Sequence, residues 1–353
     1  MTDNELPTLR WGIIGCGLIS SWFVGDLVLS RSDAAAQHTI AAIGSSSVQK
    51  GKDFATKHCP AQTPAIYDSY KGVYDDLNVE IVYIGTPHPM HHANVMDAIA
   101  AGKHVLCEKP MAMNAQQGHE MAEAARKKGV FLMEAMWTRF FPATKELQRL
   151  IHADKVIGDV SAVWVDFGLF QPIKGRDPAS RTASKRLGAG ALLDIGIYSL
   201  TWASVVLDTV PNSSPNVSAN MILSEHEDPN DRVDEQVTVV LQYPEQRAQA
   251  ICTASLLYKS PEIFARIEGS KGSISVGGPA AAKPGFFFVK VRDEEERKLD
   301  FPVEGRGFYY EADAVALDIR AGRLEDETCP LSTTQTILSR MDGVMDLCGL
   351  SYT

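Results

Sequence analysis

Long apolar runs and an excess of basic residues are both missing from this sequence of 353 residues. A membrane-spanning helix needs about 18 apolar residues in a row, and no run approaches that length. The 34 Lys and Arg against 44 Asp and Glu give a net charge of −10, which argues against general binding to nucleic acids or anionic membranes. The start of the chain carries Asp3 and Glu5 and has no apolar core, unlike a signal peptide. We therefore expect a cytoplasmic protein with no nucleic-acid partner and no membrane segment.

Cysteine is also scarce, and its six copies form no pattern. None stands in a C-x-x-C pair or at a zinc-ligand spacing, so we expect reduced thiols and no metal site. Hydrophobic residues make up 45% and charged residues 22%, which is ordinary for a globular chain. A chain of this length can bury a core without disulfides or structural metals, and it suggests about two domains.

The first part of the chain alternates short apolar stretches with amphipathic ones. Patterns typical of buried strands lie at Trp11–Ile14, Thr39–Ile43, Glu80–Ile84, His104–Leu106 and Val130–Met133. Helical periodicity lies at Val48–Lys57, His91–Ala101 and Ala115–Lys128. Strands that alternate with helices predict a parallel sheet covered on both faces. We assign residues 1–141 to this α/β domain.

After residue 141 strand patterns follow one another with few helices between them. The expected strands are Val160–Phe170, Val217–Ser224, Gln236–Tyr243, Gln249–Leu257, Ile263–Glu268, Gly272–Val276 and Phe286–Arg292. The expected helices are Ile197–Leu207, Tyr309–Arg320 and Thr333–Leu347. This order predicts that residues 142–353 form an α+β domain with a large, mostly antiparallel open sheet.

That sheet also predicts how the protein assembles. Alternate residues such as Val237, Val239 and Leu241 share one side, and Phe286–Phe288 add aromatic bulk. Few helices are available to cover the sheet, and a soluble domain rarely exposes a large apolar surface. We therefore expect a homodimer formed through the sheet. The alternative is an outward face that is polar enough to stay solvated, as Thr238 partly suggests.

The first expected strand runs into the segment Gly15–Ser20, which matches the pattern G-x-G-x-x-small. In this pattern the first Gly permits a tight turn, the second lets backbone N–H groups approach a pyrophosphate, and the small residue allows close helix packing. A glycine-rich turn alone can be merely structural. Its place in the first strand–turn–helix unit indicates a dinucleotide site in a Rossmann domain, contacted by Gly15, Gly17, Leu18 and Ile19.

The end of the second expected strand bears on the choice of cofactor. A carboxylate there would bind the ribose hydroxyls of NAD. Here the strand runs into Ser45, Ser46 and Ser47, with Lys50 close behind. Hydroxyl and ammonium groups suit a 2′-phosphate, so we expect NADP(H). The alternative is a solvated serine-rich turn before a basic helix start.

Polar residues also follow the third and fourth expected strands. Thr86–His88 end the third strand, His91 opens the next helix, and the fourth strand ends in Glu108 and Lys109. Ligands bind at this edge of a parallel sheet, so Lys109 is a candidate acid/base group, although a lysine before a turn proline can simply be a surface residue. The histidines lack a carboxylate at a metal-ligand spacing, which favours hydrogen bonding or packing.

The segment Gly190–Tyr198 contains the most informative pair. Asp194 and Tyr198 are four residues apart, so they share one face of a helix start. A phenol beside a carboxylate and a lysine is a plausible proton relay, since a nearby cation favours the phenolate. A helix-capping Asp with a packed Tyr would give the same pattern.

Taken together, these residues resemble the Gfo/Idh/MocA oxidoreductases, and within them the branch of dihydrodiol dehydrogenases and fungal NADP-dependent D-xylose 1-dehydrogenases. The resemblance covers nearly the whole chain. The segments that carry it are Gly15–Ser20, Ser45–Ser47, Thr86-Pro87 with His91, Ala101–Pro110, Met133–Pro142, Asp194 with Tyr198, Gly269–Gly272 and Tyr310–Asp313.

The resemblance implies a role for each matching residue. Lys109, Asp194 and Tyr198 would be catalytic, with Tyr198 as the acid/base. Arg181 would contact substrate oxygens, and Trp137 and Phe167 would form pocket walls, beside Tyr198. The residues expected to contact the cofactor are Gly15, Gly17, Leu18, Ile19, Ser45, Ser46, Ser47, Lys50, Thr86, Pro87, His88, His91, Glu108, Lys109, Trp137 and Arg139.

The activity that the resemblance implies is NADP-dependent hydride transfer between nicotinamide and a hydroxyl or carbonyl carbon of a sugar or cyclic diol. A biosynthetic carbonyl or imine reductase is the alternative, and a non-catalytic NADP-binding regulator is a third possibility. The chain departs from the family pattern at Ser20, His88, Lys185 and Ala189. The last three border the substrate side, so the resemblance does not fix the substrate.

Overall fold

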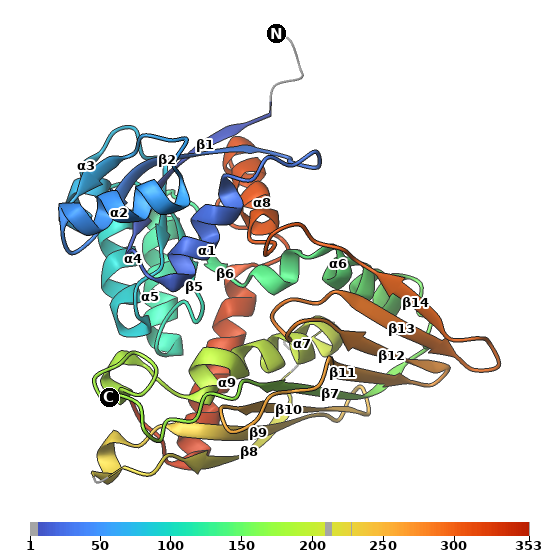
Figure 1. The fold of residues 1–353 in the computed structure, drawn as a ribbon. Helices are drawn as coiled ribbons and strands as arrows, with labels where there is room; N and C mark the ends of the chain where they lie inside the picture. Colours follow the sequence, from blue (N-terminus) through green and yellow to red (C-terminus); the bar gives the residue numbers. More distant parts are fainter. Residues whose placement is uncertain (1–5, 209–213, 227, 353) are drawn as a thin grey trace. The chain divides into compact units, whose positions relative to one another are not determined.

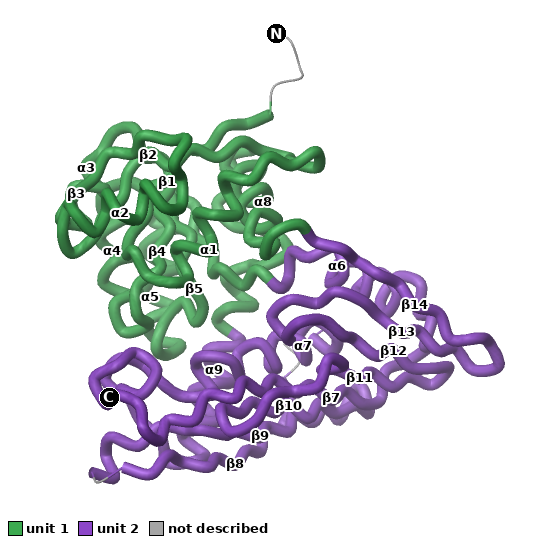
Figure 2. The backbone as a smooth tube through the Cα atoms, in the orientation of Figure 1, with its two compact units in different colours: residues 1–137, 304–335 green, residues 138–303, 336–353 purple. Residues whose placement is uncertain are grey.

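The computed structural model describes residues 6–208, 214–226 and 228–352, and they form two compact units. Unit 1 comprises residues 1–137 and 304–335, and unit 2 comprises residues 138–303 and 336–353 (Figure 2). This division differs from the single boundary at residue 141 that the sequence suggested, because Glu304–Gln335 belong with the first unit.

Unit 1 is built on a six-stranded parallel sheet in the order β3-β2-β1-β4-β5-β6 (Figure 1). Five of its strands correspond to the apolar stretches expected from the sequence, and the short β3 was not expected. The strands are β1 (Thr8–Ile14), β2 (Gln37–Gly44), β3 (Ala65–Tyr67), β4 (Ile81–Ile84), β5 (His104–Glu108) and β6 (Leu132–Ala135). The predicted parallel sheet is thus confirmed.

Some helices of unit 1 begin or end at recognisable capping residues. Ser47 caps α2 by accepting a hydrogen bond from the Lys50 amide, and Asn114 caps α5 in the same way. Gly129, at φ +73°, ends α5 in the left-handed conformation that glycine tolerates. The helices are α1 (Leu18–Leu27), α2 (Val48–His58), α3 (Tyr70–Asp75), α4 (His91–Ala100), α5 (Ala115–Lys128) and α8 (Tyr309–Arg320), and a 3₁₀ turn η1 (His88–Met90) precedes α4.

Unit 2 contains an eight-stranded sheet in the order β14-β13-β12-β11-β7-β10-β9-β8. Every neighbouring pair is antiparallel except β7 with β10, which confirms the mostly antiparallel sheet. The strands are β7 (Val160–Gly168), β8 (Asn216–Leu223), β9 (Asp234–Tyr243), β10 (Ala248–Ser255), β11 (Ile263–Gly269), β12 (Gly272–Gly277), β13 (Phe286–Val291) and β14 (Arg297–Asp300).

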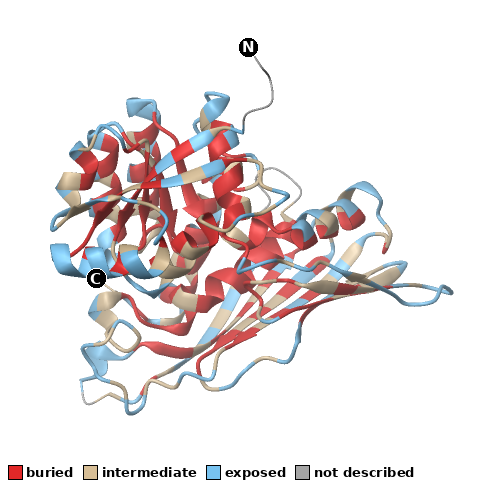
Figure 3. Ribbon diagram, turned by 45° about the horizontal axis from the view of Figure 1, so that its top comes forward, coloured by how far each residue is buried: buried red, intermediate tan, exposed pale blue. Residues whose placement is uncertain are grey.

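Helices lie along one side of this sheet, as α6, α7 and α9 show in Figure 1. Buried residues alternate with more exposed ones along β9, and Figure 3 shows buried and exposed positions mixed along the sheet. Val237, Val239 and Leu241 are buried on the side that faces the chain's own helices, so the expectation that these residues form an uncovered face is wrong. The helical segments are α6 (Pro142–Gln148), η3 (Arg149–Ala153), η4 (Lys185–Leu187), η5 (Leu192–Gly196), α7 (Ile197–Leu207), η6 (Pro229–Asp231) and α9 (Leu331–Cys348, which begins in unit 1), and η2 (Trp137–Phe140) crosses the unit boundary.

One stretch, Lys185–Leu207, is long and apolar enough to cross a membrane by length and composition alone. However, 94% of its most apolar window is buried inside the fold, and every residue of α7 is buried. The core helix of a globular unit has the same composition, so this stretch is weak support for a membrane span.

The carboxylate of Asp26 connects the returning segment of the chain to α1. It accepts hydrogen bonds from three consecutive backbone amides, at 3.1 Å from Arg306, 2.6 Å from Gly307 and 2.9 Å from Phe308. Asp26 is only 4% exposed, so water has little access to these amides. A single buried carboxylate therefore fixes the backbone that leads into α8.

Replacement Asp26→Ala should lower the free energy of unfolding by roughly 2–4 kcal/mol, because it leaves buried N–H groups without an acceptor. Urea denaturation followed by circular dichroism would measure the loss. The control is Asp33→Ala, whose carboxylate is 58% exposed and whose loss should cost well under about 1 kcal/mol. Equal stability of Asp26→Ala and the wild type would contradict the anchoring role.

Candidate active site

The glycine loop after β1 has the backbone that a phosphate-binding turn requires. Gly15 has φ +89°, and a Cβ there would come within 3.1 Å of the Gly85 carbonyl oxygen. Gly17 is the exposed residue before α1, and a Cβ on it would meet nothing closer than 3.9 Å. Leu18 and Ile19 then form the first turn of α1. The backbone amides at this helix start are therefore open to an anion.

Ser20 occupies the small-residue position of the motif for a steric reason. Its side chain is fully buried, and a Cβ on Gly85 would collide with its hydroxyl. The Ser20 hydroxyl has no hydrogen-bond partner among the described residues. Close packing of α1 on the sheet therefore depends on a small residue at 20 and on glycine at 85.

The turn after β2 presents hydroxyl and ammonium groups. Ser45 donates to the carbonyl oxygen of Ser47 at 2.6 Å, while Ser46 and Lys50 are exposed. Burial raises the pKa of the neighbouring Cys16 thiol, and the charge of Lys50 acts on that thiol in the opposite direction. Lys50 is thus close to the glycine loop. Together the open helix start, the hydroxyls and this cation fit a phosphorylated dinucleotide.

His91 connects the turns that follow β4 and β5. Its ring nitrogens lie 2.9 Å from the carbonyl oxygen of Pro110 and 2.8 Å from that of Thr86. Asn94 also donates to the Thr86 hydroxyl, at 3.1 Å. Next to Pro87, His88 is buried with its ring 5.7 Å from that of His91. At the carboxyl edge of the sheet, His91 therefore hydrogen-bonds backbone carbonyl groups, and His88 packs beside it.

The turn that carries Lys109 is fixed by two buried carboxylates. Glu108 accepts hydrogen bonds from the Tyr83 hydroxyl at 2.6 Å and from the Lys109 amide at 3.2 Å. Glu134 accepts one from the Met111 amide at 2.8 Å. Lys109 itself is half-buried and directly follows β5. Its backbone is thus held on both sides by side chains from neighbouring strands.

In unit 2 the structure brings four of the expected residues together in two pairs. Arg181 and Asp194 form an ion pair at 3.0 Å. The rings of Phe167 and Tyr198 meet edge to face, 5.5 Å apart, and Tyr198 is 5% exposed. Asp194 lies in the π-helical segment η5 and Tyr198 at the start of α7, so both belong to one continuous helical segment.

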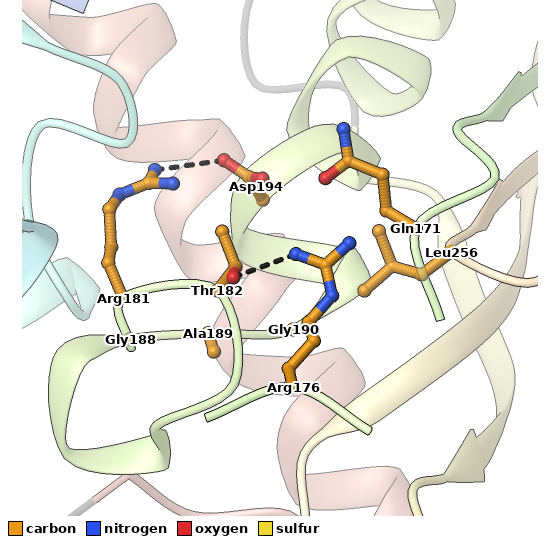
Figure 4. A pocket seen from close by; sticks show the side chains of 9 residues that line it. All are labelled: Gln171, Arg176, Arg181, Thr182, Gly188, Ala189, Gly190, Asp194 and Leu256. Carbon is orange, nitrogen blue, oxygen red and sulfur yellow. Dashed lines mark hydrogen bonds and ion pairs between the residues drawn. The ribbon is translucent and has the colours of Figure 1, made fainter. Parts of the chain in front are cut away.

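Arg181 and Asp194 also line a polar pocket within unit 2 (Figure 4). A second guanidinium, that of Arg176, points into this pocket and donates to the Thr182 hydroxyl at 2.8 Å. The remaining lining residues are Gln171, Gly188, Ala189, Gly190 and Leu256. Several donors and one carboxylate facing a small space suit a ligand that is rich in oxygen atoms.

Asp234 holds the backbone that carries the pocket residues Gly190 and Asp194. Its carboxylate accepts hydrogen bonds from the Leu192 amide at 2.6 Å and from the Tyr352 hydroxyl at 3.3 Å. Burial raises the pKa of Asp234 to about 6. Gly190 has φ +132°, and a Cβ there would collide with Asp234 and Tyr352. The glycine is therefore required for the backbone to approach this carboxylate.

Two residues with predicted roles lie at the unit boundary. Trp137 stacks on Phe308 in unit 1, with ring centres 4.2 Å apart and an angle of 13° between the planes. Arg139 is buried in unit 2 and donates to the Ser204 hydroxyl at 3.2 Å. The contact of Arg139 with α7 gives no support to its predicted role in cofactor binding.

The sequence did not single out several residues that hold these sites. None of them carries a predicted role of its own, and several act through a partner from another element of the fold, although Glu134 lies in the segment Met133–Pro142 that carries the resemblance. Within the residues that the structure describes, no group of three or more His, Cys, Asp and Glu is arranged to hold a metal ion. The residues that were missed are Tyr83, Asn94, Glu134, Gln171, Arg176, Thr182 and Asp234.

Comparisons with known proteins agree with this architecture. A family model described as an oxidoreductase family with an NAD-binding Rossmann fold matches residues 9–136, and the GFO/IDH/MocA C-terminal domain matches residues 144–275. A human trans-1,2-dihydrobenzene-1,2-diol dehydrogenase is 35% identical over 351 residues, with 98% of each chain covered. A D-xylose 1-dehydrogenase (NADP(+)) from Hypocrea jecorina is 32% identical, with 100% of this chain and 95% of the relative covered.

Solved structures share the fold. An aldose-aldose oxidoreductase from Caulobacter crescentus, complexed with glycerol, superposes with a TM-score of 0.81 at 24% identity and covers 97% of this chain and 98% of its own. A 3-ketoreductase from Actinomadura kijaniata, in complex with NADP, gives a TM-score of 0.79 at 21% identity, with 97% and 98% covered. The resemblance drawn from the sequence is thereby confirmed, and the chain belongs to the Gfo/Idh/MocA family of oxidoreductases.

Proposed function

We propose that the protein is an NADP-dependent oxidoreductase that interconverts a hydroxyl and a carbonyl group on a sugar or cyclic diol. The observation that carries this proposal is Asp194, which lines the polar pocket of unit 2 one helical turn before the buried phenol of Tyr198. Relatives at 32–35% identity are named as dehydrogenases of a dihydrodiol and of D-xylose, and both substrates carry adjacent hydroxyl groups.

Each of the three catalytic residues has a distinct chemical task in this proposal. When bound, the nicotinamide supplies the site that accepts or donates hydride. Tyr198 takes the proton from the substrate hydroxyl during oxidation and returns it during reduction. The task that the family resemblance assigns to the Lys109 ammonium is to stabilise the developing alkoxide of the substrate. The Asp194 carboxylate balances the positive charge of the catalytic residues. Arg181, which forms an ion pair with Asp194 at 3.0 Å, orients substrate oxygens.

The choice of cofactor follows from the turn after β2. Residues Gly44–Lys50 contain no carboxylate that would repel a 2′-phosphate. The exposed hydroxyl of Ser46 and the exposed ammonium of Lys50 are available to bind one. The Hypocrea relative is named as an NADP(+) enzyme.

Titration should therefore show tighter binding of NADP than of NAD to the wild-type protein. Replacement Ser46→Asp places a negative charge near the 2′-phosphate and should weaken NADP binding by about tenfold or more, with a smaller effect on NAD. Ser46→Ala is the matched control, since it removes the hydroxyl without adding charge. Tighter NAD binding, or equal affinities in the wild type, would overturn the preference.

The proton-relay roles predict two strong losses of activity. Tyr198→Phe keeps the ring that packs against Phe167, so the fold and NADP binding should persist while kcat falls by a factor on the order of 10²–10⁴. Lys109→Met should lose activity by a comparable factor. Steady-state kinetics under conditions where chemistry limits the rate would measure both effects. Near wild-type kcat in Tyr198→Phe would show that the tyrosine is not the acid/base.

We also propose that two copies of the chain pair through the outer face of the eight-stranded sheet. On that face Trp164 is 40% exposed and Ile222 is 53% exposed. Val240, Ile251, Phe286 and Phe288 alternate with polar residues there. A sheet with helices on one side only leaves this broad, partly apolar face to be covered, and an isologous dimer is the simplest cover.

Sedimentation at micromolar concentration should show a species of twice the 38.5 kDa chain mass. Trp164→Glu should shift the protein toward the monomer, because it places a charge in the centre of the apolar face. The control is Leu77→Glu on unit 1, where the leucine is already 92% exposed. A wild-type protein that sediments only near 38.5 kDa would refute the dimer.

A further inference from the structure

Three carboxyl groups from different elements of unit 1 are buried behind the turn that carries Lys109. Glu108 on β5 is 5% exposed, Glu134 on β6 is 3% exposed, and Glu311 on α8 is not exposed at all. Glu311 lies close enough to both of the others for their charges to act on it. Three negative charges buried together would be very costly in free energy, so we expect at least one of the three carboxyl groups to carry a proton.

The hydrogen bonds divide the three groups into two kinds. Glu108 accepts from the Tyr83 hydroxyl and the Lys109 amide, and Glu134 accepts from the Met111 amide and, at 3.0 Å, from the Thr334 hydroxyl. Donors around a carboxyl group stabilise its ionised form. Both oxygens of Glu311 are buried and have no hydrogen-bond partner among the described residues. The geometry therefore places the proton of the cluster on Glu311.

The other titratable groups around Glu311 agree with this assignment. Burial raises the pKa of the Glu311 carboxyl well above its usual range, and the charges of Glu108 and Glu134 raise it further. Burial also raises the pKa of the Tyr83 phenol and of the Cys107 thiol, so both remain neutral. Neither group introduces a negative charge that would compete with Glu108 and Glu134 for the surrounding donors.

We propose that Glu311 is a positioning residue that stays a neutral carboxylic acid and so lets Glu108 and Glu134 remain the ionised acceptors that hold the Lys109 turn. Ionisation of Glu311 at alkaline pH puts a third negative charge beside them. The resulting repulsion displaces the acceptors from the Lys109 and Met111 amides and moves Lys109. The proposal rests on the proposed catalytic role of Lys109, and it assigns Glu311 to the alkaline limit of activity and of stability.

The sign of the pH effect follows from linkage. The unfolded chain ionises Glu311 at the ordinary pKa of glutamate, whereas the folded protein holds the proton to a higher pH. The stability is therefore unaffected by this group below the ordinary pKa and falls as the pH rises from there through the folded-state pKa. A neutral residue of the same shape at 311 would remove that fall.

The decisive variant is Glu311→Gln, which mimics the neutral acid at every pH. The alkaline midpoint of its kcat profile should lie about one pH unit or more above that of the wild type, and its thermal midpoint should decline less between neutral and alkaline pH. Glu327→Gln is the matched control, because Glu327 is exposed in the same unit. Superimposable profiles for Glu311→Gln and wild type, or a folded Glu311→Gln protein inactive at every pH, would overturn the proposal.

A measurement on the wild-type protein covers the case in which the variant does not fold. Infrared spectra of protein with ¹³C-labelled glutamate should show the C=O stretch of a protonated carboxylic acid at neutral pH, and its loss at alkaline pH should accompany the loss of activity. Absence of this band at neutral pH would refute the assignment. Full turnover by Lys109→Met would instead refute the proposed catalytic role, while the infrared result would still decide the protonation of Glu311.

Discussion

The buried hydrogen bonds to the backbone between Cys107 and Met111 are the constraint on which the proposed chemistry of unit 1 depends. A lysine can act on a substrate only if its backbone is fixed, because its long side chain is flexible. Here the carboxylates of Glu108 and Glu134 and the ring of His91 each bind a different part of that turn. Residues from three neighbouring elements thereby fix the backbone position from which the Lys109 side chain extends.

Unit 2 uses the same principle with different residues. The helical segment that carries Asp194 and Tyr198 begins at a backbone amide held by Asp234, from the first residue of β9. The left-handed glycine before it permits that approach. In both units, a half-buried reactive side chain, Lys109 or Asp194, stands on backbone that is held by buried acidic groups. This separation lets the pocket stay polar while its supports are shielded from water.

The parts predictable from the sequence were those with a local signal. Apolar stretches located most strands, and α7 and α8 have the predicted bounds, whereas β3 and β14 have only three and four residues and mostly exposed or half-buried side chains. Motifs singled out Lys109 and Asp194, and the family resemblance added Arg181. Asp234 was missed, and Glu311 was noted only within the segment Tyr310–Asp313, because a charged residue in a sequence looks solvated. Only the tertiary fold shows that each is buried against residues far away in the chain.

The return of residues 304–335 to the first unit affects the order in which the protein can mature during synthesis. Asp26 is synthesised before the second sheet, but the amides that it binds belong to residues 306–308, which follow the last strand of that sheet. Until then the Asp26 carboxylate on α1 lacks the amides that it binds in the folded protein, because α8 with Phe308 and Glu311 has not yet been made. The nucleotide-binding unit is therefore completed only after all the strands of the large sheet have been made.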